Sequence, residues 1–239
     1  MKALILVGGK GTRLKPYTTV IPKPLLPVGD RPILEIILEQ LRLAEVEEVV
    51  LAVGHMSHLF ESFFKDGERH GIKISYSFEE EALGTAGALA NSLDRLGEDF
   101  LVMNGDLLTT LNYKNLFAYH KENNSSGTIA TFKREVQMDF GVLNFDSEGR
   151  LQSLEEKPTY SYNFGMGVNV LNSEIASKFI KKDQYLDMPD LMMHMKDDGE
   201  TIFCYQEDCF WLDMGRPEDY EKANEEYEAR KEDFFPVEY

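Results

Sequence analysis

Short apolar runs alternate with longer amphipathic stretches over the first hundred residues of the chain. Apolar runs of about five residues are typical of buried strands, whereas apolar residues at every third or fourth position are typical of helices. The predicted strands cover residues 3–7, 48–53, 73–78 and 99–103. The predicted helices cover residues 32–44, 57–65 and 84–96. This alternation predicts a parallel sheet covered by helices, and such sheets bind ligands at the carboxyl ends of their strands.

The pattern changes after residue 125, where short strands follow one another with few helices between them. The predicted strands cover residues 128–133, 140–146, 151–155, 167–171, 201–205 and 210–212. The predicted helices cover residues 174–181, 189–195 and 217–230. No Pro/Ser-rich linker or internal repeat divides the chain. We therefore predict one α/β domain over residues 1–239, with a mixed but mainly parallel central sheet flanked by helices.

The first predicted strand runs into a glycine-rich loop, which reads GGKGTRL from Gly8. Glycines allow backbone N–H groups to turn inward and approach a ligand, and several such groups form an anion-binding concavity. Arg13 adds a planar charged group suited to phosphate oxygens. Lys23 adds a second cation on a segment stiffened by Pro22 and Pro24. The sequence therefore predicts a polyphosphate site, and the two cations disfavour the alternative of a tight turn without a ligand.

Two other phosphate-binding loops do not fit this stretch. A P-loop needs the sequence Gly-Lys-Ser/Thr, which does not occur in residues 1–28. A dinucleotide fingerprint needs a third glycine at the position of Leu14. A dinucleotide-dependent oxidoreductase is therefore disfavoured.

The pattern GGKGTRL followed by PKPLLPV resembles the sugar-1-phosphate nucleotidyltransferases, and within that family it is most similar to the mannose-1-phosphate guanylyltransferases. The resemblance extends from Met1 to about Tyr220. It implies a Rossmann-like fold in which the glycine-rich loop wraps an NTP. It also implies that this part of the chain contacts the nucleotide through Leu6, Gly8, Gly9, Gly11, Thr12 and Arg13.

Two aspartates follow apolar strands in distant parts of the chain, Asp106 in Asn-Gly-Asp and Asp213 in Trp-Leu-Asp-Met-Gly. Mg²⁺ prefers oxygen ligands and typically takes one or two carboxylates plus substrate phosphates. By residue type alone, Asp106 fits a turn equally well and Asp213 fits a helix N-terminus. The resemblance implies that both bind Mg²⁺, because the family carries a Gly-Asp turn and a later W-x-D-x-G segment. It places Arg13, Lys23 and Asp106 in catalysis.

An acidic stretch, EEEALGTAG, begins at Glu79 after the third predicted strand. Glutamates before a helix are favoured electrostatically even without a ligand. In relatives that use UTP or dTTP, a glutamine at the matching position pairs with the pyrimidine. An ionised carboxylate only accepts hydrogen bonds and matches the two adjacent donors of guanine, so Glu79 favours GTP, unless a shift in register brings Glu80 there. Further nucleotide contacts are expected from Gly84, Thr85 and Gly105.

Glu156 and Lys157 follow another predicted strand in the sequence Glu-Glu-Lys-Pro. A carboxylate can accept hydrogen bonds from sugar hydroxyls while an ammonium group meets a phosphate, although a polar turn explains the same residues. The resemblance assigns Glu156 to the sugar and Lys157 to its 1-phosphate, and it places the Gly141 backbone against the sugar. Gly165 stands where many relatives carry an asparagine that touches the sugar, which leaves the identity of the sugar open.

Composition narrows the class of partner. The chain of 239 residues has 42 acidic and 25 basic residues and a formal net charge of −17, which argues against binding to nucleic acid or to anionic membranes. Cys204 and Cys209 fit neither a zinc pattern nor a disulfide framework, so reduced thiols are expected. The chain opens without a signal peptide, and no apolar run reaches the ~18 residues that span a bilayer. We therefore expect a cytoplasmic protein.

Residues and resemblance together predict a Mg²⁺-dependent transfer of a nucleotidyl group from an NTP to a sugar 1-phosphate, with GTP and mannose 1-phosphate as the first choice. Residues 1–125 are expected to bind the NTP and residues 126–239 the sugar phosphate. The nearest alternative is the same chemistry with UTP, dTTP or CTP and a glucose-type or other phosphate. A catalytically silent sensor of sugar nucleotides is more distant, because the charged residues of the site are all present.

Two features near the end of the chain concern its length and assembly. Many relatives continue into a C-terminal β-helix, and we expect none here because the chain stops at residue 239. The apolar tail at residues 234–237 is expected to pack on the body or on a partner subunit. A homo-oligomer is left open.

Overall fold

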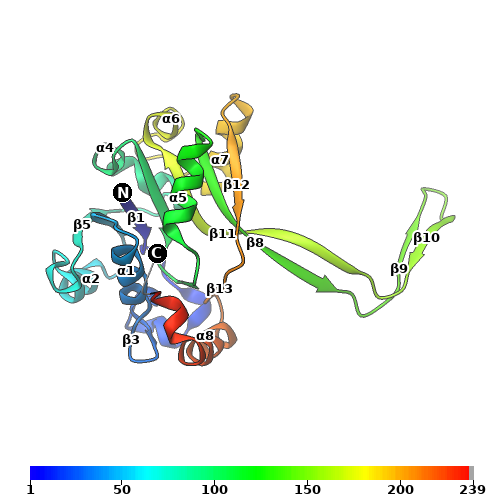
Figure 1. Ribbon diagram of the computed structural model, residues 1–239, viewed down its shortest axis with the longest axis horizontal. Helices are drawn as coiled ribbons and strands as arrows, with labels where there is room; N and C mark the ends of the chain where they lie inside the picture. The colour runs from blue at the N-terminus through cyan, green and yellow to red at the C-terminus, as the bar shows by residue number, and fades with distance from the viewer. Residues whose placement is uncertain (237–239) are drawn as a thin grey trace.

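A seven-stranded sheet forms the centre of the computed structural model, which describes residues 1–236 (Figure 1). From one edge to the other the strands are β12 (Ile202–Gln206), β8 (Gly127–Gln137), β11 (Thr159–Asn172), β6 (Asp99–Asn104), β1 (Lys2–Leu6), β4 (Glu48–Val53) and β5 (Lys73–Phe78). Neighbouring strands are parallel except that β11 runs antiparallel to both β6 and β8. The predicted mixed, mainly parallel sheet is therefore confirmed.

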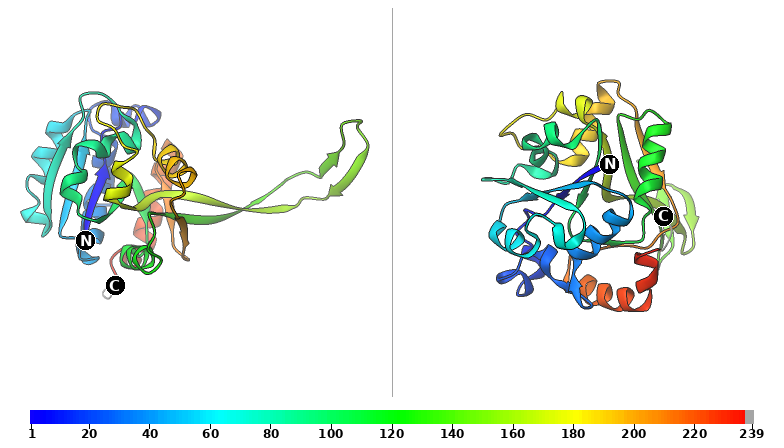
Figure 2. Two further views of the ribbon diagram at one scale, coloured as in Figure 1. Left: turned by 90° about the horizontal axis from the view of Figure 1, so that it is seen from above. Right: turned by 60° about the vertical axis from the view of Figure 1, so that its left-hand side comes forward.

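Helices cover both faces of the sheet (Figure 2). One face packs against α1 (Ile33–Leu43), α2 (Ser57–Phe64), α5 (Tyr113–Glu122) and α8 (Pro217–Ala229). The other packs against α3 (Gly84–Gly87), α4 (Leu93–Leu96), α6 (Ser173–Ser177) and α7 (Met188–Asp197). In β1, Ala3 and Ile5 point to the first face and Leu4 to the second, so both faces of the strand are buried. Burial on both faces explains why β1, β4 and β6 read as continuous apolar runs.

Two helical predictions differ from the structure. No helix was predicted at α5, in which only Tyr113, Leu116 and His120 are buried, so its apolar periodicity is weak. The single helix predicted over residues 84–96 is divided into α3, a 3-10 turn and α4. A Cβ on Gly87 would lie 2.7 Å from the carbonyl oxygen of Gln184, so α3 is packed directly against a neighbouring backbone segment. No helix within residues 1–236 has both the length and the apolar character needed to cross a membrane.

Beyond the body of the sheet, β8 and β11 continue as a two-stranded arm that projects from the molecule (Figures 1 and 2). The two strands pair from Thr131 and Gly165 out to Gln137 and Thr159. At the far end lies a second antiparallel pair, β9 (Val142–Phe145) and β10 (Leu151–Glu155). We refer to residues 132–164 as the arm. The strands predicted at 128–133 and 167–171 were too short, because the outer parts of β8 and β11 carry no buried apolar run.

The smaller sheets and the C-terminal segment complete the body. β2 (Pro27–Val28) pairs with β3 (Arg31–Pro32), and β7 (Leu107–Thr109) pairs with β13 (Trp211–Asp213). Phe234 is fully buried, and its ring contacts the rings of Phe210 and Tyr227. The apolar tail therefore packs on the body through Phe234, and residues 237–239 lie outside the described part of the chain.

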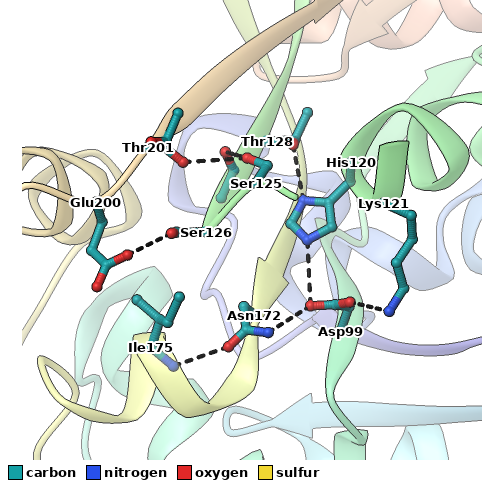
Figure 3. A network of polar contacts seen from close by, with 11 residues as sticks. Asp99, His120, Lys121, Ser125, Ser126, Thr128, Asn172, Ile175, Glu200 and Thr201 are labelled. Atoms are coloured by element: carbon teal, nitrogen blue, oxygen red, sulfur yellow. Dashed lines mark hydrogen bonds and ion pairs between the residues drawn. The ribbon is translucent and has the colours of Figure 1, made fainter. Parts of the chain in front are cut away.

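A buried polar network holds β6, α5 and β11 together at the end of the sheet where β6 begins (Figure 3). The carboxylate of Asp99 accepts a hydrogen bond from Asn172 Nδ2 at 2.9 Å, contacts Lys121 Nζ, and lies 3.4 Å from His120 Nε2. His120 Nδ1 lies 2.9 Å from the hydroxyl of Thr128 on β8. Burial lowers the pKa of His120 below its ordinary value of 6.5, although the nearby Asp99 carboxylate opposes this shift.

This network predicts that acid weakens the fold. Because the folded protein takes up a proton at His120 less readily than the unfolded chain, its contribution to stability is present above pH 6.5 and is lost as the pH falls below that value. Burial works to raise the pKa of Asp99, but its contacts with Lys121 and Asn172 prevail and lower it, so a further loss follows below pH 3.8. Urea unfolding at pH 7.5 and pH 5.5 measures the first effect, and His120→Gln should reduce the difference between the two midpoints. An equal difference in both proteins would remove His120 from this account.

Candidate active site

A cavity of about 410 Å³ opens at the carboxyl ends of β1, β4, β5 and β6. Most of the residues that the sequence analysis assigned to the nucleotide line it, namely Leu6, Gly8, Gly9, Gly11, Thr12, Arg13, Glu79, Gly84 and Thr85. Lys23 and Asp106, predicted to act in catalysis, line the same cavity. The structure thus brings together three segments that are far apart in the sequence, at the edge of the sheet where ligands of this fold class bind.

Two glycines around the cavity, one in the glycine-rich loop and one at the end of β6, occupy positions that a larger residue would disturb. Gly11 has a φ of +57°, and the hydroxyl of Thr18 donates a hydrogen bond to its carbonyl oxygen at 2.7 Å. Gly105 packs directly on β1: its N–H donates to the carbonyl oxygen of Leu6 at 3.0 Å, and a Cβ there would lie 2.5 Å from Val7 Cγ1. Gly105 therefore supports the cavity from behind by holding the end of β6 against the end of β1.

Lys23 joins the two predicted metal ligands. β13 pairs antiparallel with β7 so that Asp213 lies opposite Leu107, which brings it beside Asp106. The Nζ atom of Lys23 lies 2.5 Å from Oδ2 of Asp106 and 3.5 Å from Oδ1 of Asp213. Burial and then the charge of Asp106 raise the pKa of Asp213, although Lys23 and Arg13 oppose the shift. A cation is thus held between two carboxylates that repel each other.

The carboxylate pair fits a hard divalent cation. Oδ1 of Asp106 is buried without a hydrogen-bond partner, so it has an acceptor position free for a cation or a donor. No group of three or more His, Cys, Asp or Glu side chains within residues 1–236 is arranged to hold a metal. Two carboxylates agree with Mg²⁺, which usually completes its shell with substrate phosphates and water.

Arg13 is the exposed cation of the cavity. It belongs to the glycine-rich loop, and its guanidinium lies close to Gly215, in the segment that carries Asp213. A Cβ on Gly215 would lie 3.7 Å from Nη1 of Arg13. Within residues 1–236 the Arg13 side chain forms no ion pair or hydrogen bond, although its charge acts on Asp213, so its donors can meet an anionic ligand.

Glu79 supplies a carboxylate with free acceptor positions inside the cavity. Its Oε1 atom is buried without a hydrogen-bond partner, and burial raises the pKa of the side chain. Its Oε2 atom would lie 3.2 Å from a Cβ on Gly8, so the side chain reaches the start of the glycine-rich loop. Glu80 is exposed and does not line this cavity, which favours Glu79 between the two registers that the sequence left open.

Asp187 and Asn104 line the cavity but were not identified from the sequence. One carboxylate oxygen of Asp187 accepts a hydrogen bond from the N–H of Thr85 at 3.1 Å, and the other accepts one from the hydroxyl of Tyr185 at 2.7 Å. The bond from Tyr185 and then that from Thr85 lower the pKa of Asp187. The sequence around Asp187 indicates only a residue that precedes a helix. Asn104, by contrast, belongs to the same Asn-Gly-Asp motif as Asp106 and could have been identified from it.

The residues predicted to bind the sugar phosphate do not line the cavity. Gly141, Glu156 and Lys157 lie on the arm, at the junction between the β8/β11 ribbon and the β9/β10 pair. They are grouped with one another, since a Cβ on Gly141 would lie 3.0 Å from Oε2 of Glu156. Gly165, where many relatives were expected to carry asparagine, pairs with Thr131 where the arm leaves the body. Within one chain the structure therefore separates the predicted sugar-binding group from the cavity.

Two curated proteins are similar in sequence to most of this chain. A mannose-1-phosphate guanylyltransferase catalytic subunit beta from Dictyostelium discoideum is 38% identical over 226 residues, which cover 92% of this chain and 62% of that protein. A UTP–glucose-1-phosphate uridylyltransferase from Synechocystis sp. is 33% identical over 242 residues, covering 93% and 62% of the two chains. The chain thus spans about 62% of the length of these curated relatives.

A solved structure is similar to this chain in fold as well as in sequence. HddC from Yersinia pseudotuberculosis, crystallised with GMP-PN, superposes with a TM-score of 0.73 at 26% identity, over 95% of this chain and 99% of that chain. The family model described as nucleotidyl transferase matches residues 2–230, which include every residue that lines the cavity. The chain therefore belongs to the nucleotidyl transferase family.

Proposed function

We propose that this protein transfers a nucleotidyl group from an NTP to a sugar 1-phosphate and releases pyrophosphate, with GTP and mannose 1-phosphate as the first pair to test. The observation that carries the proposal is the composition of one cavity. The glycine-rich loop, two cations and the Asp106 carboxylate line it together, and Asp213 lies beside them. These groups match the needs of a polyphosphate and its metal ion.

In the proposed reaction an oxygen of the sugar phosphate attacks the α-phosphorus of the NTP. A bond forms between that oxygen and the α-phosphorus, the bond to the bridging oxygen breaks, and pyrophosphate leaves with the electron pair. No covalent intermediate on the enzyme is required, so the protein contributes positioning and charge stabilisation. Arg13 would stabilise the departing pyrophosphate, and Lys23 would contact the phosphate region nearest the transferred group.

Asp106 and Asp213 would hold the Mg²⁺ ion of the proposed reaction. Bound there, the ion would neutralise charge on the phosphates. The free acceptor position on Asp106 and the mutual repulsion of the two carboxylates support this assignment. Lys23 would keep the two side chains together by offsetting part of that repulsion.

Glu79 supports GTP as the nucleotide. Guanine presents its N1–H and 2-amino donors side by side, and the free carboxylate oxygen of Glu79 could accept one of them inside the cavity. The GMP-PN complex of HddC shows a guanine nucleotide on a related fold. The name of the Synechocystis relative specifies UTP and glucose 1-phosphate. UTP with a glucose-type phosphate is therefore the second candidate pair.

Pyrophosphate release over a grid of substrates tests the proposal. The enzyme is mixed with Mg²⁺, one of GTP, UTP, dTTP, CTP or ATP, and the 1-phosphate of mannose, glucose, N-acetylglucosamine or a heptose. We expect release with GTP to exceed release with the pyrimidine nucleotides. Strong pyrophosphate release with UTP or dTTP would support the proposed reaction and contradict the proposed role of Glu79. No release from any pair, with GTP still binding in calorimetry, would favour a silent sensor of nucleotides.

The proposal places the enzyme in the cytoplasm, where reduced thiols are the rule. Cys204 and Cys209 are both free, and Cys204 is exposed. Burial raises the pKa of the Cys209 thiol to about 11, which makes this thiol unreactive near neutral pH.

Arg13→Ala is expected to lower kcat about 30-fold, because a hydrogen bond to a charged group contributes about 2 kcal/mol. The side chain is exposed, so the fold should be unaffected. Steady-state kinetics with saturating GTP measure the effect, and circular dichroism checks the fold. Lys10→Ala is the matched control, because Lys10 is an exposed cation of the same loop that does not line the cavity. Unchanged turnover in Arg13→Ala would remove Arg13 from the mechanism.

A further inference from the structure

The arm leads the predicted sugar-binding group away from the cavity of its own chain. β11 passes the cavity at Gly167, where a Cβ would lie 2.7 Å from Nδ2 of Asn104, one of the lining residues. From Gly167 to Thr159 the strand makes eight residue steps of about 3.3 Å, which amounts to about 26 Å. Lys157 lies two residues further along the chain. Figures 1 and 2 show that the β8/β11 ribbon leads away from the body and that the β9/β10 pair bends to one side beyond it.

The arm exposes an unusual amount of apolar surface for a two-stranded element. Phe140 is 82% exposed, Phe145 68% and Leu151 61%. Leu154 and Tyr162 are also exposed. An isolated two-stranded ribbon is marginally stable in water, and a contiguous exposed apolar surface of this kind is typical of an interaction site. The arm therefore has the character of an interaction surface.

The charged group at the junction of the β8/β11 ribbon and the β9/β10 pair is held in a defined conformation. Lys157 has a φ of +46°, which is rare for a residue with a long side chain and typical of functional sites. The N–H of Met138 donates a hydrogen bond to the carbonyl oxygen of Pro158 at 2.9 Å, which closes the chain around this position. Glu156 and Lys157 are nevertheless exposed to solvent. They present a carboxylate and an ammonium group that contact nothing on their own body.

The body also exposes apolar side chains beside the cavity. Between Arg13 and Lys23, both of which line the cavity, Val20 is 70% exposed, Tyr17 45% and Ile21 38%. We refer to Tyr17, Val20 and Ile21 as the loop patch. One chain thus has an apolar arm that carries the charged side chains of Glu156 and Lys157. It also has an exposed apolar patch beside a cavity that these two side chains do not line. Two copies satisfy both surfaces in a closed, two-fold arrangement, because the same contact then forms twice.

We propose that the arm docks on the loop patch of a second copy of this chain and delivers Glu156 and Lys157 to the cavity of that copy. The inference rests on the proposed function, since it identifies where the sugar 1-phosphate is held. Lys157 contacts the phosphate of the sugar substrate and Glu156 accepts hydrogen bonds from its hydroxyls. Each complete site then contains the nucleotide cavity of one copy and the arm of the other. A single chain binds the NTP but lacks the residues that hold its co-substrate.

Sedimentation of an arm variant tests the docking. The wild-type protein should sediment as a dimer and Phe145→Asp as a monomer, with calorimetric affinity for GTP unchanged. Phe63→Asp is the matched control, because Phe63 is 54% exposed on α2, and it should remain dimeric. A monomeric wild-type protein, or a Phe145→Asp variant that remains dimeric, would overturn the inference. GTP binding by Phe145→Asp shows that the body has folded, so this readout does not depend on transferase activity.

Mixed dimers test whether the site is shared. Asp106→Ala and Lys157→Ala chains are co-expressed with different tags, and the doubly tagged dimer is purified. This dimer has one wholly native site out of two, so we expect about half of the wild-type activity, whereas each parent dimer is inactive. The control dimer of Asp106→Ala with Lys23→Ala should stay inactive, because both changes lie in the body and each site retains one.

The outcomes separate the inference from the proposed function. An inactive mixed dimer alongside an active wild-type enzyme would show that each arm serves its own chain, which would overturn the inference and leave the proposed function standing. A wild-type protein that transfers no nucleotidyl group to any sugar phosphate would overturn the proposed function, and the sedimentation experiment would still decide whether the arms are exchanged.

Discussion

Asp106→Asn is expected to lower kcat about a thousandfold, which corresponds to about 4 kcal/mol of lost transition-state stabilisation. The side chain sits at the centre of the proposed site: one carboxylate oxygen contacts Lys23 at 2.5 Å and the other is buried without a partner. Asparagine keeps the shape of the side chain but removes the charge that would hold a divalent cation. The loss should therefore appear in kcat at Mg²⁺ concentrations that saturate the wild-type enzyme.

The effect of Asp106→Asn on stability should be small. The substitution removes the charge that raises the pKa of Asp213, so the repulsion between the two side chains disappears and offsets the loss of the contact with Lys23. Thermal unfolding checks this expectation. Asp198→Asn, at an exposed residue just beyond α7, is the control and should leave kcat unchanged. A kcat for Asp106→Asn within tenfold of the wild-type value would contradict the proposed metal site.

Glu79→Gln is expected to change which nucleotide is used. The carboxylate offers two acceptors, whereas the amide replaces one of them with a donor that faces a donor of guanine. We expect kcat/KM for GTP to fall about 100-fold, or about 2.7 kcal/mol, because a mispaired polar group in a partly buried site is costly. UTP, which presents one donor between two carbonyls, should become a better substrate than it is for the wild-type enzyme.

The neighbouring glutamate provides the control for this prediction. Glu80→Gln makes the same chemical change at an exposed residue that does not line the cavity, so the ratio of kcat/KM for GTP and UTP should stay at the wild-type value. An equal loss for every NTP in Glu79→Gln would indicate a structural effect. A change of preference in Glu80→Gln alone would show that the other register of the acidic stretch holds the base.

The body of the fold was predictable because its strands are buried on both faces. β1, β4 and β6 each form an apolar run, and the glycine-rich loop follows the first of them directly. α5 was not predictable in this way, since few of its residues are buried. The outer parts of β8 and β11 were missed for a related reason: exposed ribbon carries no buried run, and the alternating pattern of Tyr160, Tyr162 and Phe164 was not recognised as strand.

The candidate site was predictable where a motif is local and unpredictable where it depends on long-range pairing. The glycine-rich loop, Arg13 and Lys23 lie within one short stretch and share one cavity. The proximity of Asp106 and Asp213 depends on the register of β7 against β13, which residue spacing alone does not determine. Asp187 reaches the cavity through its bonds to Tyr185 and Thr85, and such a tertiary contact leaves no sequence signature.

The direction of the arm was not predictable from the sequence. Residues 126–239 were expected to bind the sugar phosphate, and β11 does reach the cavity at Gly167. The segment that carries Glu156 and Lys157, however, extends away from the body (Figure 1). Because the paired strands are regular from Gly165 to Thr159, their direction is set by the sheet from which they emerge. The sequence motifs that predict the cavity carry no information about the direction of the arm.

The fate of a labelled α-phosphate tests the central proposal most directly. The enzyme is incubated with Mg²⁺, mannose 1-phosphate and GTP labelled with ³²P at the α-phosphate, and the products are treated with alkaline phosphatase. Nucleotidyl transfer predicts that the label moves into a sugar nucleotide, which has no terminal phosphate and resists the phosphatase, in step with pyrophosphate release. Label recovered only as inorganic phosphate after the treatment, with GTP consumed, would show that the enzyme breaks a different bond and would contradict the account.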